Sequence, residues 1–321
     1  GGEITASGGS YGAGIGGGKG VYLASDKKIH GGDGKVTITG GKITATSKSF
    51  GAGIGGGYQG LGKVTIEGDA VIKNAQGGEA GAGIGSGTYG DSNILIRGNA
   101  VIENAESSAN GAGIGSGQGD LYPDGDGMVI DLTVGNVTIE GNAKIENAKS
   151  GSGGSGIGGG AVGIGNVIIR GNAQIGNATG GEEGAGIGGG ALGTGDVTIE
   201  GNVTIENAQG GAGAAGIGGG AETEPDTEDT RNKISIKSTE AGSPDITATG
   251  GGACKNSHVS LLGAAAIGSG SVNKSSDQAK KAKSAITIEG KVTINATSGG
   301  DVAIGDNIDG EKVFNGLAGG T

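Results

Sequence analysis

The chain has 321 residues, of which 83 are glycine, and its 22 basic and 33 acidic side chains give a net charge of −11. The glycines follow no three-residue period, which excludes collagen, and the single cysteine excludes an internal disulfide or a CxxC metal site. No apolar run reaches about 18 residues, so membrane insertion is not expected, and the acidic charge argues against nucleic acid, which binds basic footprints.

A glycine-rich motif, G-x-G-I-G-x-G, recurs along the chain. Its central isoleucines are Ile15, Ile54, Ile84, Ile114, Ile157, Ile187, Ile217 and Ile267, with Ile304 in a degraded ninth copy. Their spacings of 39, 30, 30, 43, 30, 30, 50 and 37 define a basal unit of 30 residues. The extra residues follow the motif in four insertions, at 19–35, 117–135, 221–232 and 271–284. Insertions confined to one point of a repeat map to one corner of a stacked array.

Two further segments recur within the unit. The first reads NVTIEGN or close to it, at Val64–Asp69, Ile94–Asn99, Val137–Asn142, Val167–Asn172 and Val197–Asn202. The second reads AxIENA, at Ala70–Ala75, Ala100–Ala105, Ala143–Ala148, Ala173–Ala178 and Val203–Ala208. Together with the glycine-rich motif they give three short runs per unit. Period-two alternation and β-branched residues predict that these runs are strands.

A unit of three short strands cannot bury its own apolar face, so it must stack on its neighbours. The sequence therefore predicts an all-β fold, a right-handed parallel β-helix with three strands per coil of about 30 residues and about eight to nine coils. We expect a repeat domain over 1–299, and a degraded last coil or cap over 300–321. The chain opens on the tail of a repeat, so we expect a partial first coil or a fragment of a larger protein.

The alternation assigns faces to each strand. In the first unit of 30 residues, between Ile54 and Ile84, we expect Val64 and Ile66, Ala70 and Ile72, and Ala82 and Ile84 to point inward. Gly83 and Gly85 then face outward, which predicts a nearly bare backbone stripe along one side of the solenoid. Glycine there permits a tight bend or unusual backbone angles. Alternatively, the stripe receives an inserted loop, a second solenoid or an extended polymer.

Polar residues recur at matching positions and predict ladders between coils. The charge ladder is Glu67, Arg97, Glu140, Arg170 and Glu200. One asparagine ladder is Asn99, Asn142, Asn172 and Asn202, with Asp69 in the same position, and the other is Asn74, Asn104, Asn147, Asn177 and Asn207. We interpret both asparagine ladders as structural, since asparagine tolerates turn conformations and its amide can bond the next amide in a stack.

Five aromatic residues are candidate ligand-binding positions: Tyr11, Phe50, Tyr58, Tyr89 and Tyr122. Exposed aromatic rings can stack on sugars. The alternative is that these residues cover exposed core near the N-terminal coils.

Insertion 117–135 contains Asp120, Asp124 and Asp126 next to glycines, and alternating oxygen ligands suit Ca²⁺. No glutamate follows at the twelfth position, so a solvated acidic turn is the alternative. Insertion 221–232 holds the acidic run ETEPDTEDT, which is typical of a flexible loop. Calcium is the one cofactor that the sequence suggests. His30 and His258 lie far apart, and no catalytic constellation emerges.

The run GAGIGGG followed by NVTIEGN and AxIENA resembles the glycine-rich parallel β-helix repeats of bacterial cell-surface adhesin-like proteins, and the resemblance covers most of 1–300. It implies an extracellular location on the bacterial surface and a role as an adhesin or stalk. No wall-sorting motif is present in this sequence.

The first functional hypothesis is a non-catalytic structural or adhesive module that presents loops on a rigid rod. Its expected partners are a host or cell-surface protein or a glycan, with lateral or end-to-end self-association as a further option. A carbohydrate-binding module is the alternative. A polysaccharide-active enzyme comes third, since it requires a cluster of acids facing one groove, and ice binding is a distant fourth.

Overall fold

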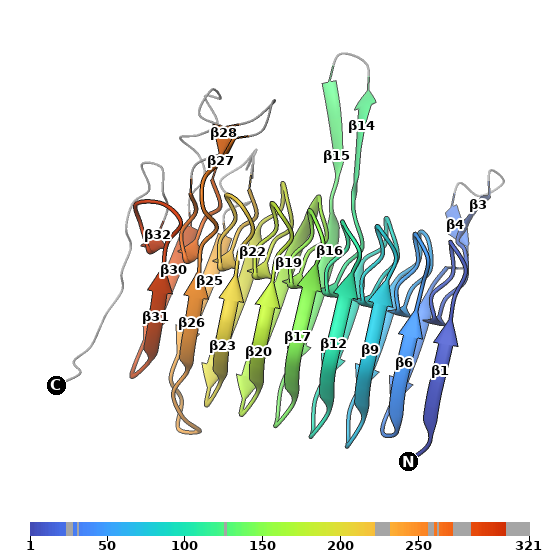
Figure 1. Ribbon diagram of the computed structural model, residues 1–321, viewed down its shortest axis with the longest axis horizontal. Helices are drawn as coiled ribbons and strands as arrows, with labels where there is room; N and C mark the ends of the chain where they lie inside the picture. Colours follow the sequence, from blue (N-terminus) through green and yellow to red (C-terminus); the bar gives the residue numbers. More distant parts are fainter. Residues whose placement is uncertain are drawn as a thin grey trace.

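The computed structural model describes residues 1–23, 28–30, 32–124, 127–221, 232–255, 260–261, 263–271 and 284–305. Its strands stack into three long parallel sheets that run the length of the molecule (Figure 1). The described residues form no helix. The chain is therefore an all-β, right-handed parallel β-helix, which confirms the fold predicted from the 30-residue repeat.

The NVTIEGN segments form the first sheet, called here the VTI sheet. Its strands are β5 (Gly34–Ile38), β8 (Gly62–Ile66), β11 (Ser92–Ile96), β16 (Thr133–Ile139), β19 (Gly163–Gly171), β22 (Gly195–Gly201), β25 (Asn232–Lys237) and β30 (Ser284–Glu289). Each strand pairs in parallel with the matching strand of the next coil, so that Ile66 lies beside both Ile38 and Ile96. Unbroken register follows from the constant spacing of the repeat.

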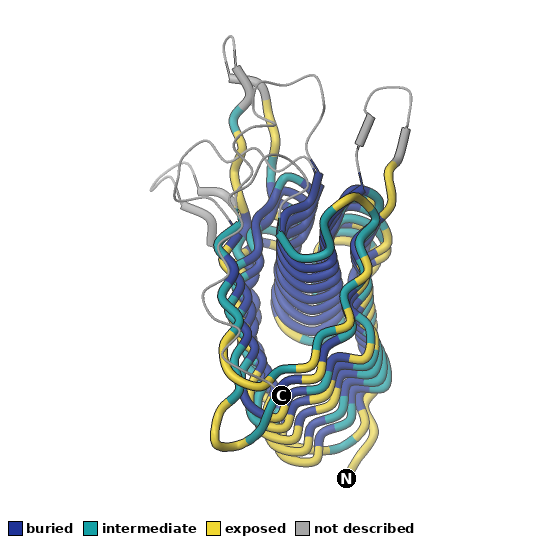
Figure 2. Tube along the Cα trace, turned by 90° about the vertical axis from the view of Figure 1, so that its left-hand side faces the viewer, coloured by how far each residue is buried: buried dark blue, intermediate teal, exposed yellow. Residues whose placement is uncertain are grey.

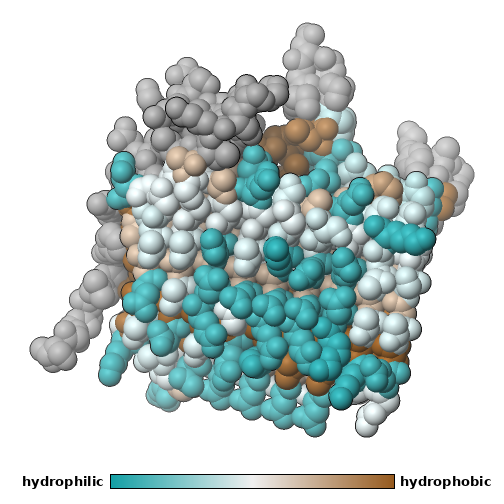
Figure 3. All heavy atoms as spheres, in the orientation of Figure 1, coloured by the Kyte–Doolittle hydropathy of each residue, from teal (hydrophilic) through white to brown (hydrophobic). Residues whose placement is uncertain are grey.

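The AxIENA segments form the second sheet, called here the ENA sheet. Its strands are β1 (Glu3–Ser7), β6 (Lys42–Thr46), β9 (Val71–Gly77), β12 (Val101–Ser107), β17 (Lys144–Ser150), β20 (Gln174–Thr179), β23 (Thr204–Gln209), β26 (Asp245–Thr249) and β31 (Thr293–Thr297). Its outer face is hydrophilic (Figure 3). Ion pairs such as Lys73–Glu103 lie on this face.

The glycine-rich motifs form the third sheet, called here the GIG sheet. Its two-residue strands are β2 (Ile15–Gly16), β7 (Ile54–Gly55), β10 (Ile84–Gly85), β13 (Ile114–Gly115), β18 (Ile157–Gly158), β21 (Ile187–Gly188), β24 (Ile217–Gly218), β29 (Ile267–Gly268) and β32 (Ile304–Gly305). β32 pairs with β29, so the degraded copy at Ile304 still adds a strand.

The exposed glycine stripe predicted from the sequence is wrong. Seen along the rod, a stack of fully buried segments lies between two outer walls (Figure 2), and Gly83 and Gly85 are buried. A Cβ atom on Gly83 would lie 2.8 Å from the carbonyl oxygen of Ala75 in the ENA sheet. A Cβ on Gly62, at the start of β8 in the VTI sheet, would lie 1.9 Å from the carbonyl oxygen of Gly85. The GIG strand therefore runs between the other two sheets, and both of its faces are interior.

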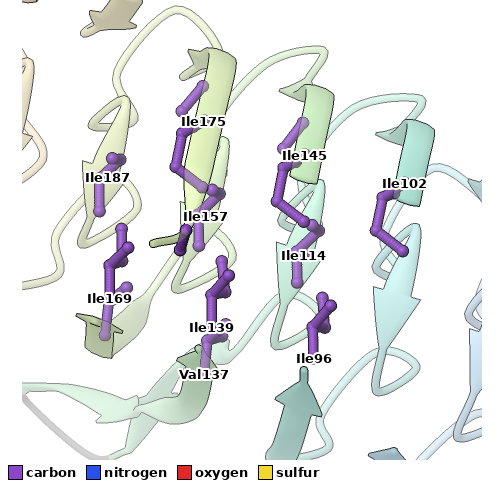
Figure 4. Packing of buried hydrophobic residues seen from close by; sticks show 14 of the residues in the cluster. Ile96, Ile102, Ile114, Val137, Ile139, Ile145, Ile157, Ile169, Ile175 and Ile187 are labelled. Atoms are coloured by element: carbon purple, nitrogen blue, oxygen red, sulfur yellow. The ribbon is translucent and has the colours of Figure 1, made fainter. Parts of the chain in front are cut away.

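The core is a set of isoleucine ladders. Ile96, Ile139 and Ile169 point in from the VTI sheet, and Ile102, Ile145 and Ile175 from the ENA sheet (Figure 4). Ile114, Ile157 and Ile187 of the GIG sheet fill the space between them (Figure 4). Each of these side chains is at most 1% exposed. A buried isoleucine stabilises the fold by about 1.5–3 kcal/mol, so the ladders supply the main driving force.

The ENA strand places one more residue, Ala75, in the core than strict alternation predicts. Ala82 is fully buried but lies outside the core cluster, whereas Ala75 belongs to it. In β9 the two residues between Ile72 and Ala75 both face outward, so the strand carries one residue more than strict alternation allows. Against β6, which lacks this residue, the pairing shifts between Ile43 and Thr44. The ENA motif is thus a β-bulge, and the bulge moves its last alanine into the core.

Three β-hairpins rise from the same side of the described rod (Figure 1). Two lie between a GIG strand and the following VTI strand, and the third lies between an ENA strand and the following GIG strand. They are β3 (Val21–Leu23) with β4 (Lys28–His30), β14 (Asp120–Asp124) with β15 (Gly127–Asp131), and β27 (Cys254–Lys255) with β28 (Ser260–Leu261). The first two fall within insertions 19–35 and 117–135. The third lies in the longest repeat interval, at a place that sequence analysis did not assign as an insertion.

We expect Gly85→Ala to unfold the central coils or weaken them severely. Gly85 has a φ of +142°, and a Cβ there would lie 1.8 Å from the carbonyl oxygen of Gly115. Backbone strain and overpacking together predict that the free energy of unfolding falls by about 3 kcal/mol or more. Urea unfolding followed by circular dichroism measures it. Gly40→Ala is the control, because nothing lies within 4 Å of a Cβ at Gly40. Equal midpoints for the two variants would contradict the close packing described above.

Candidate functional site

Four of the five candidate aromatic residues come together at the N-terminal end of the rod. Tyr11 and Phe50 precede strands β2 and β7, and Tyr58 and Tyr89 follow β7 and β10. Because the coils stack, these turns lie next to one another on the side of the rod that carries the hairpins. We call Tyr11, Phe50, Tyr58 and Tyr89 the aromatic cluster. Tyr122 lies apart from it, in hairpin strand β14.

The rings of the aromatic cluster pack on one another. Tyr11 stacks on Phe50 with centroids 5.2 Å apart and an interplanar angle of 23°. Tyr58 meets both rings edge-on, at 5.5 Å from Tyr11 and 5.7 Å from Phe50. The Nζ of Lys19 lies 4.5 Å from the centroid of Tyr11. Each such ring pair stabilises the folded protein by about 0.5–1.5 kcal/mol. The rings thus pack as one group, in which Tyr11 and Tyr89 remain 42% and 37% exposed, and ligand binding by these residues stays a prediction.

Tyr89 links the aromatic cluster to the hairpin β14–β15. Its ring contacts Tyr58 edge-on at 5.7 Å. Partial burial raises the pKa of its phenol, and the negative charge of nearby Asp120, which also hydrogen bonds it, raises it further. Tyr89 has a φ of +61°, a left-handed conformation that tyrosine rarely adopts. Asp120 is therefore engaged at the base of the hairpin, where its carboxylate also accepts a hydrogen bond from the backbone N–H of Leu121.

The hairpin β14–β15 presents apolar side chains to solvent. Leu121 pairs across the hairpin with Ile130, and Tyr122 pairs with Val129. Leu121, Tyr122 and Ile130 are 43–44% exposed. Brown, hydrophobic atoms are visible at the base of this hairpin (Figure 3). A two-stranded ribbon has no core of its own, so these side chains stay available for contact with another molecule.

The calcium hypothesis rests on three aspartates, of which two lie in β14. Asp126 lies outside the described residues, as does the side chain of Asp124. Within the described part of the chain, no group of three or more His, Cys, Asp or Glu side chains is arranged to hold a metal ion. Most of the acidic insertion 221–232 also lies outside the described residues. Calcium binding stays a prediction.

Both asparagine ladders are hydrogen bonded from coil to coil. In the first, each amide donates to the previous coil, over the pairs Asn99–Asp69, Asn142–Asn99, Asn172–Asn142 and Asn202–Asn172 at 3.1–3.4 Å. In the second, the pairs are Asn147–Asn104, Asn177–Asn147 and Asn207–Asn177 at 3.1–3.3 Å. Asn166 and Asn136 form a further pair at 3.0 Å on the VTI sheet, which sequence analysis missed.

The second ladder has a specific role at the β-bulge. Asn147 Nδ2 donates to the backbone carbonyl of Glu103 at 3.1 Å as well as to the Asn104 side chain. Asn104 Nδ2 donates in the same way to the carbonyl of Lys73. Asn104, Asn147 and Asn177 therefore each satisfy the carbonyl of the extra residue in the bulge of the preceding coil. This is why the repeat keeps asparagine immediately before the buried alanine.

The charged ladder on the VTI sheet is made of separate pairs. Arg97 binds Glu67 and Arg170 binds Glu140, with 2.6 Å between the guanidinium and carboxylate atoms in both cases. Glu200 pairs with Lys237 at 3.3 Å. Each basic residue thus bonds the acid on the preceding coil. All these groups are partly exposed, so each pair contributes under about 1 kcal/mol.

An open groove of about 590 Å³ crosses the outer face of the VTI sheet, over β16, β19, β22, β25 and β30. Six of its fourteen lining residues carry hydroxyl or amide side chains, and Ile168 is 39% exposed within it. Asp196 is the only acid among the lining residues, and it lies 3.7 Å from Lys233. The groove thus lacks the pair of acids that glycoside hydrolysis uses.

Glu183 is a partly buried acid on the side that carries the hairpins. Burial raises the pKa of its carboxyl, and neighbouring Glu182 raises it further. A raised carboxyl pKa is typical of catalytic acids, but it also arises at structural positions. Of the two histidines, His30 belongs to β4 and His258 lies outside the described residues. Within the described residues, these groups therefore do not lie together around one position where a substrate could react.

A family model described as a beta helix repeat matches residues 1–19 and 36–58. This match covers the first two glycine-rich motifs and the strands beside them, and it agrees with the observed fold. No curated protein and no solved structure matches the chain. Among the described residues, no helix is long and apolar enough to cross a membrane.

We expect Asn147→Ala to destabilise the protein by about 1–3 kcal/mol, because it removes the donor to the bulge carbonyl of Glu103 and one of the two acceptors of the Asn177 amide. Asn166→Ala is the matched control, since it removes one hydrogen bond between exposed side chains and should cost about 1 kcal/mol or less. Urea unfolding midpoints compare the two. A larger loss for Asn166→Ala would contradict the role assigned to the bulge ladder.

We expect Glu183→Gln to raise the thermal midpoint at pH 7. The pKa of Glu183 is higher in the folded than in the unfolded protein. The stabilisation that its protonated carboxyl gives the folded state is therefore fully present below the unfolded pKa, and it is lost as the pH rises through the folded pKa. The gain over wild type should therefore shrink as the pH falls towards about 4. Calorimetry across this range tests it, with exposed Glu240→Gln as control. A pH-independent difference would show that the charge of Glu183 is not responsible.

Proposed function

We propose that this chain is an extracellular structural and adhesive module of a bacterial surface protein, a rod that presents hairpins along one side. One observation carries the proposal: the hairpins β3–β4, β14–β15 and β27–β28 rise from the same side of a continuous β-helix (Figure 1). The resemblance of the repeats to those of bacterial surface proteins supports the location.

The rod is built to be stiff. Its core continues from coil to coil without a break, and the VTI and GIG sheets keep their register between neighbouring coils. The ENA sheet shifts its register at the pairs β6–β9 and β23–β26. Coils in parallel sheets are about 4.8 Å apart, so nine coils extend about 40 Å. A stiff support holds the hairpins at fixed spacing, which lowers the entropy lost when several of them engage one partner.

The exposed apolar pair Leu121 and Ile130 suits contact with a protein partner on a cell surface. Burying such side chains at an interface stabilises a complex by about 25 cal/mol per Å². The aromatic cluster, whose rings contact one another, contributes rigidity next to this hairpin. A carbohydrate-binding module is the second candidate, and the groove on the VTI sheet is the feature that favours it.

The adhesive role is tested with beads that carry the purified chain, washed over a cultured epithelial cell layer under shear. We expect bead retention above that of albumin-coated beads. The double variant Leu121→Ser/Ile130→Ser should lower retention by about tenfold, as expected for loss of interface anchors. Thr65→Ala, in strand β8 of the VTI sheet and away from the hairpin, should leave it unchanged.

Circular dichroism verifies that the variants stay folded, and sedimentation verifies that self-association does not change. Retention equal to that of albumin beads would overturn the adhesive proposal. Normal retention of the double variant would overturn the role of the β14–β15 hairpin.

A further inference from the structure

The groove on the VTI sheet runs along the rod rather than along a strand. It crosses five successive strands, from β16 to β30, and each strand contributes equivalent outward positions. The inner row of these positions is Thr138, Ile168, Thr198, Ser235 and Thr287. Because the strands pair in register, these side chains form one line at intervals of about 4.8 Å. A ligand that fits this line is an extended chain with a repeating unit.

The outer row adds amides and one charge pair. It consists of Asn136, Asn166, Asp196, Lys233 and, on the last strand, Ala285. Asn166 donates to Asn136 at 3.0 Å, and Lys233 lies 3.7 Å from Asp196. These side chains are partly exposed, so they keep donors and acceptors for a ligand. The two rows together offer hydroxyl, amide and paired charged groups over the full length of the groove.

The chemistry of the groove excludes two kinds of extended polymer. A peptide that adds as a strand needs free backbone groups, but β16, β19, β22 and β25 pair with neighbours on both sides. A polyanion meets no excess of positive charge, because Lys233 is paired with Asp196. Close to the groove, Arg170 is likewise paired with Glu140. The chain carries a net charge of −11, which adds long-range repulsion.

A neutral polysaccharide satisfies these requirements. Sugar hydroxyls pair with amides and hydroxyls, while the C–H faces of sugar rings need apolar contact. Ile168 supplies that contact as the second residue of the inner row, where it is 39% exposed. The same isoleucine breaks the threonine row that a regular ice-binding plane requires. The neighbouring coils carry Thr138 and Thr198 at this position, so the exposed isoleucine is not required by the fold.

We propose that the groove on the VTI sheet binds an extended, neutral polysaccharide lying along the rod axis, with the hydroxyl and amide rows at its sides and Ile168 beneath a sugar ring. This site is distinct from the hairpins, and it goes beyond the adhesive role proposed above.

The test is calorimetric titration of the whole chain with three hexasaccharides. Cellohexaose is neutral and extended, maltohexaose is neutral and coiled, and hexagalacturonate is extended and acidic. We expect saturable binding of cellohexaose, with weaker binding of the other two. No saturation with cellohexaose up to about 10 mM would overturn the proposal. So would equal or tighter binding of hexagalacturonate or maltohexaose.

Variants place the binding in the groove. Ile168→Thr copies the residue of the adjacent coils and should weaken cellohexaose binding by about tenfold through the loss of one ring contact. Ser235→Tyr should abolish binding, because its ring fills the groove. Thr65→Ile, on the same row but outside the groove, should change nothing.

Unchanged affinity in both groove variants would overturn the assignment even if the sugar binds. Retention of Ile168→Thr beads on epithelial cells should stay normal, so a failure of the groove and a failure of the hairpin adhesion give different results.

Discussion

The structure depends on the close approach of the GIG strand to the backbones of its neighbours. At Gly85 the left-handed backbone and the carbonyl of Gly115 leave no space for a Cβ atom. Glycine at this position in every coil lets a third sheet enter between the other two. The isoleucine before each such glycine then fills the centre of the coil. The high glycine content is thus a packing requirement of the core rather than a sign of flexibility.

Other features follow from this inner strand. Because its isoleucine completes the core, the other two sheets need only small and β-branched side chains, and bulky aromatics have no place inside. The aromatics are instead gathered at the N-terminal edge, where Tyr11, Phe50 and Tyr58 contact one another. The bulge in the ENA sheet brings Ala75 into the core and leaves a carbonyl that the asparagine of the next coil satisfies. Core packing and the polar ladder are therefore consequences of the same extra residue.

The sequence was sufficient to predict the β-helix, the three strands per coil and the positions of the isoleucines, because each depends on a short period that repeats many times. It failed at Gly83 and Gly85, because alternation was taken to give every strand one solvent face. The inward orientation of Ala75 was missed for a related reason, because a bulge changes the alternation of inward and outward residues within a single motif. The asparagine before Ala75, in every regular repeat, was the signal that could have revealed the bulge.

The candidate sites were less predictable. Clustering of Tyr11, Phe50, Tyr58 and Tyr89 follows from their similar positions in adjacent coils, but ring packing depends on turn geometry. The groove on the VTI sheet was not predicted, because Thr138, Ile168 and Thr198 occupy ordinary outward positions within their own repeats. Its lining combines five coils, and neither its depth nor the pairing of Lys233 with Asp196 can be read from one repeat.

Hydrogen exchange followed by mass spectrometry tests the central claim most directly. The amides of Ile84 and Ile114 donate to Gly113 and Gly156 of the next coils at 3.0 Å, between two sheets. The account predicts that peptides containing these strands exchange more slowly than any others, and far more slowly than the hairpin β14–β15. Exchange of the GIG strands as fast as that of the hairpin would contradict it, since that result describes an exposed glycine stripe and not an interior sheet.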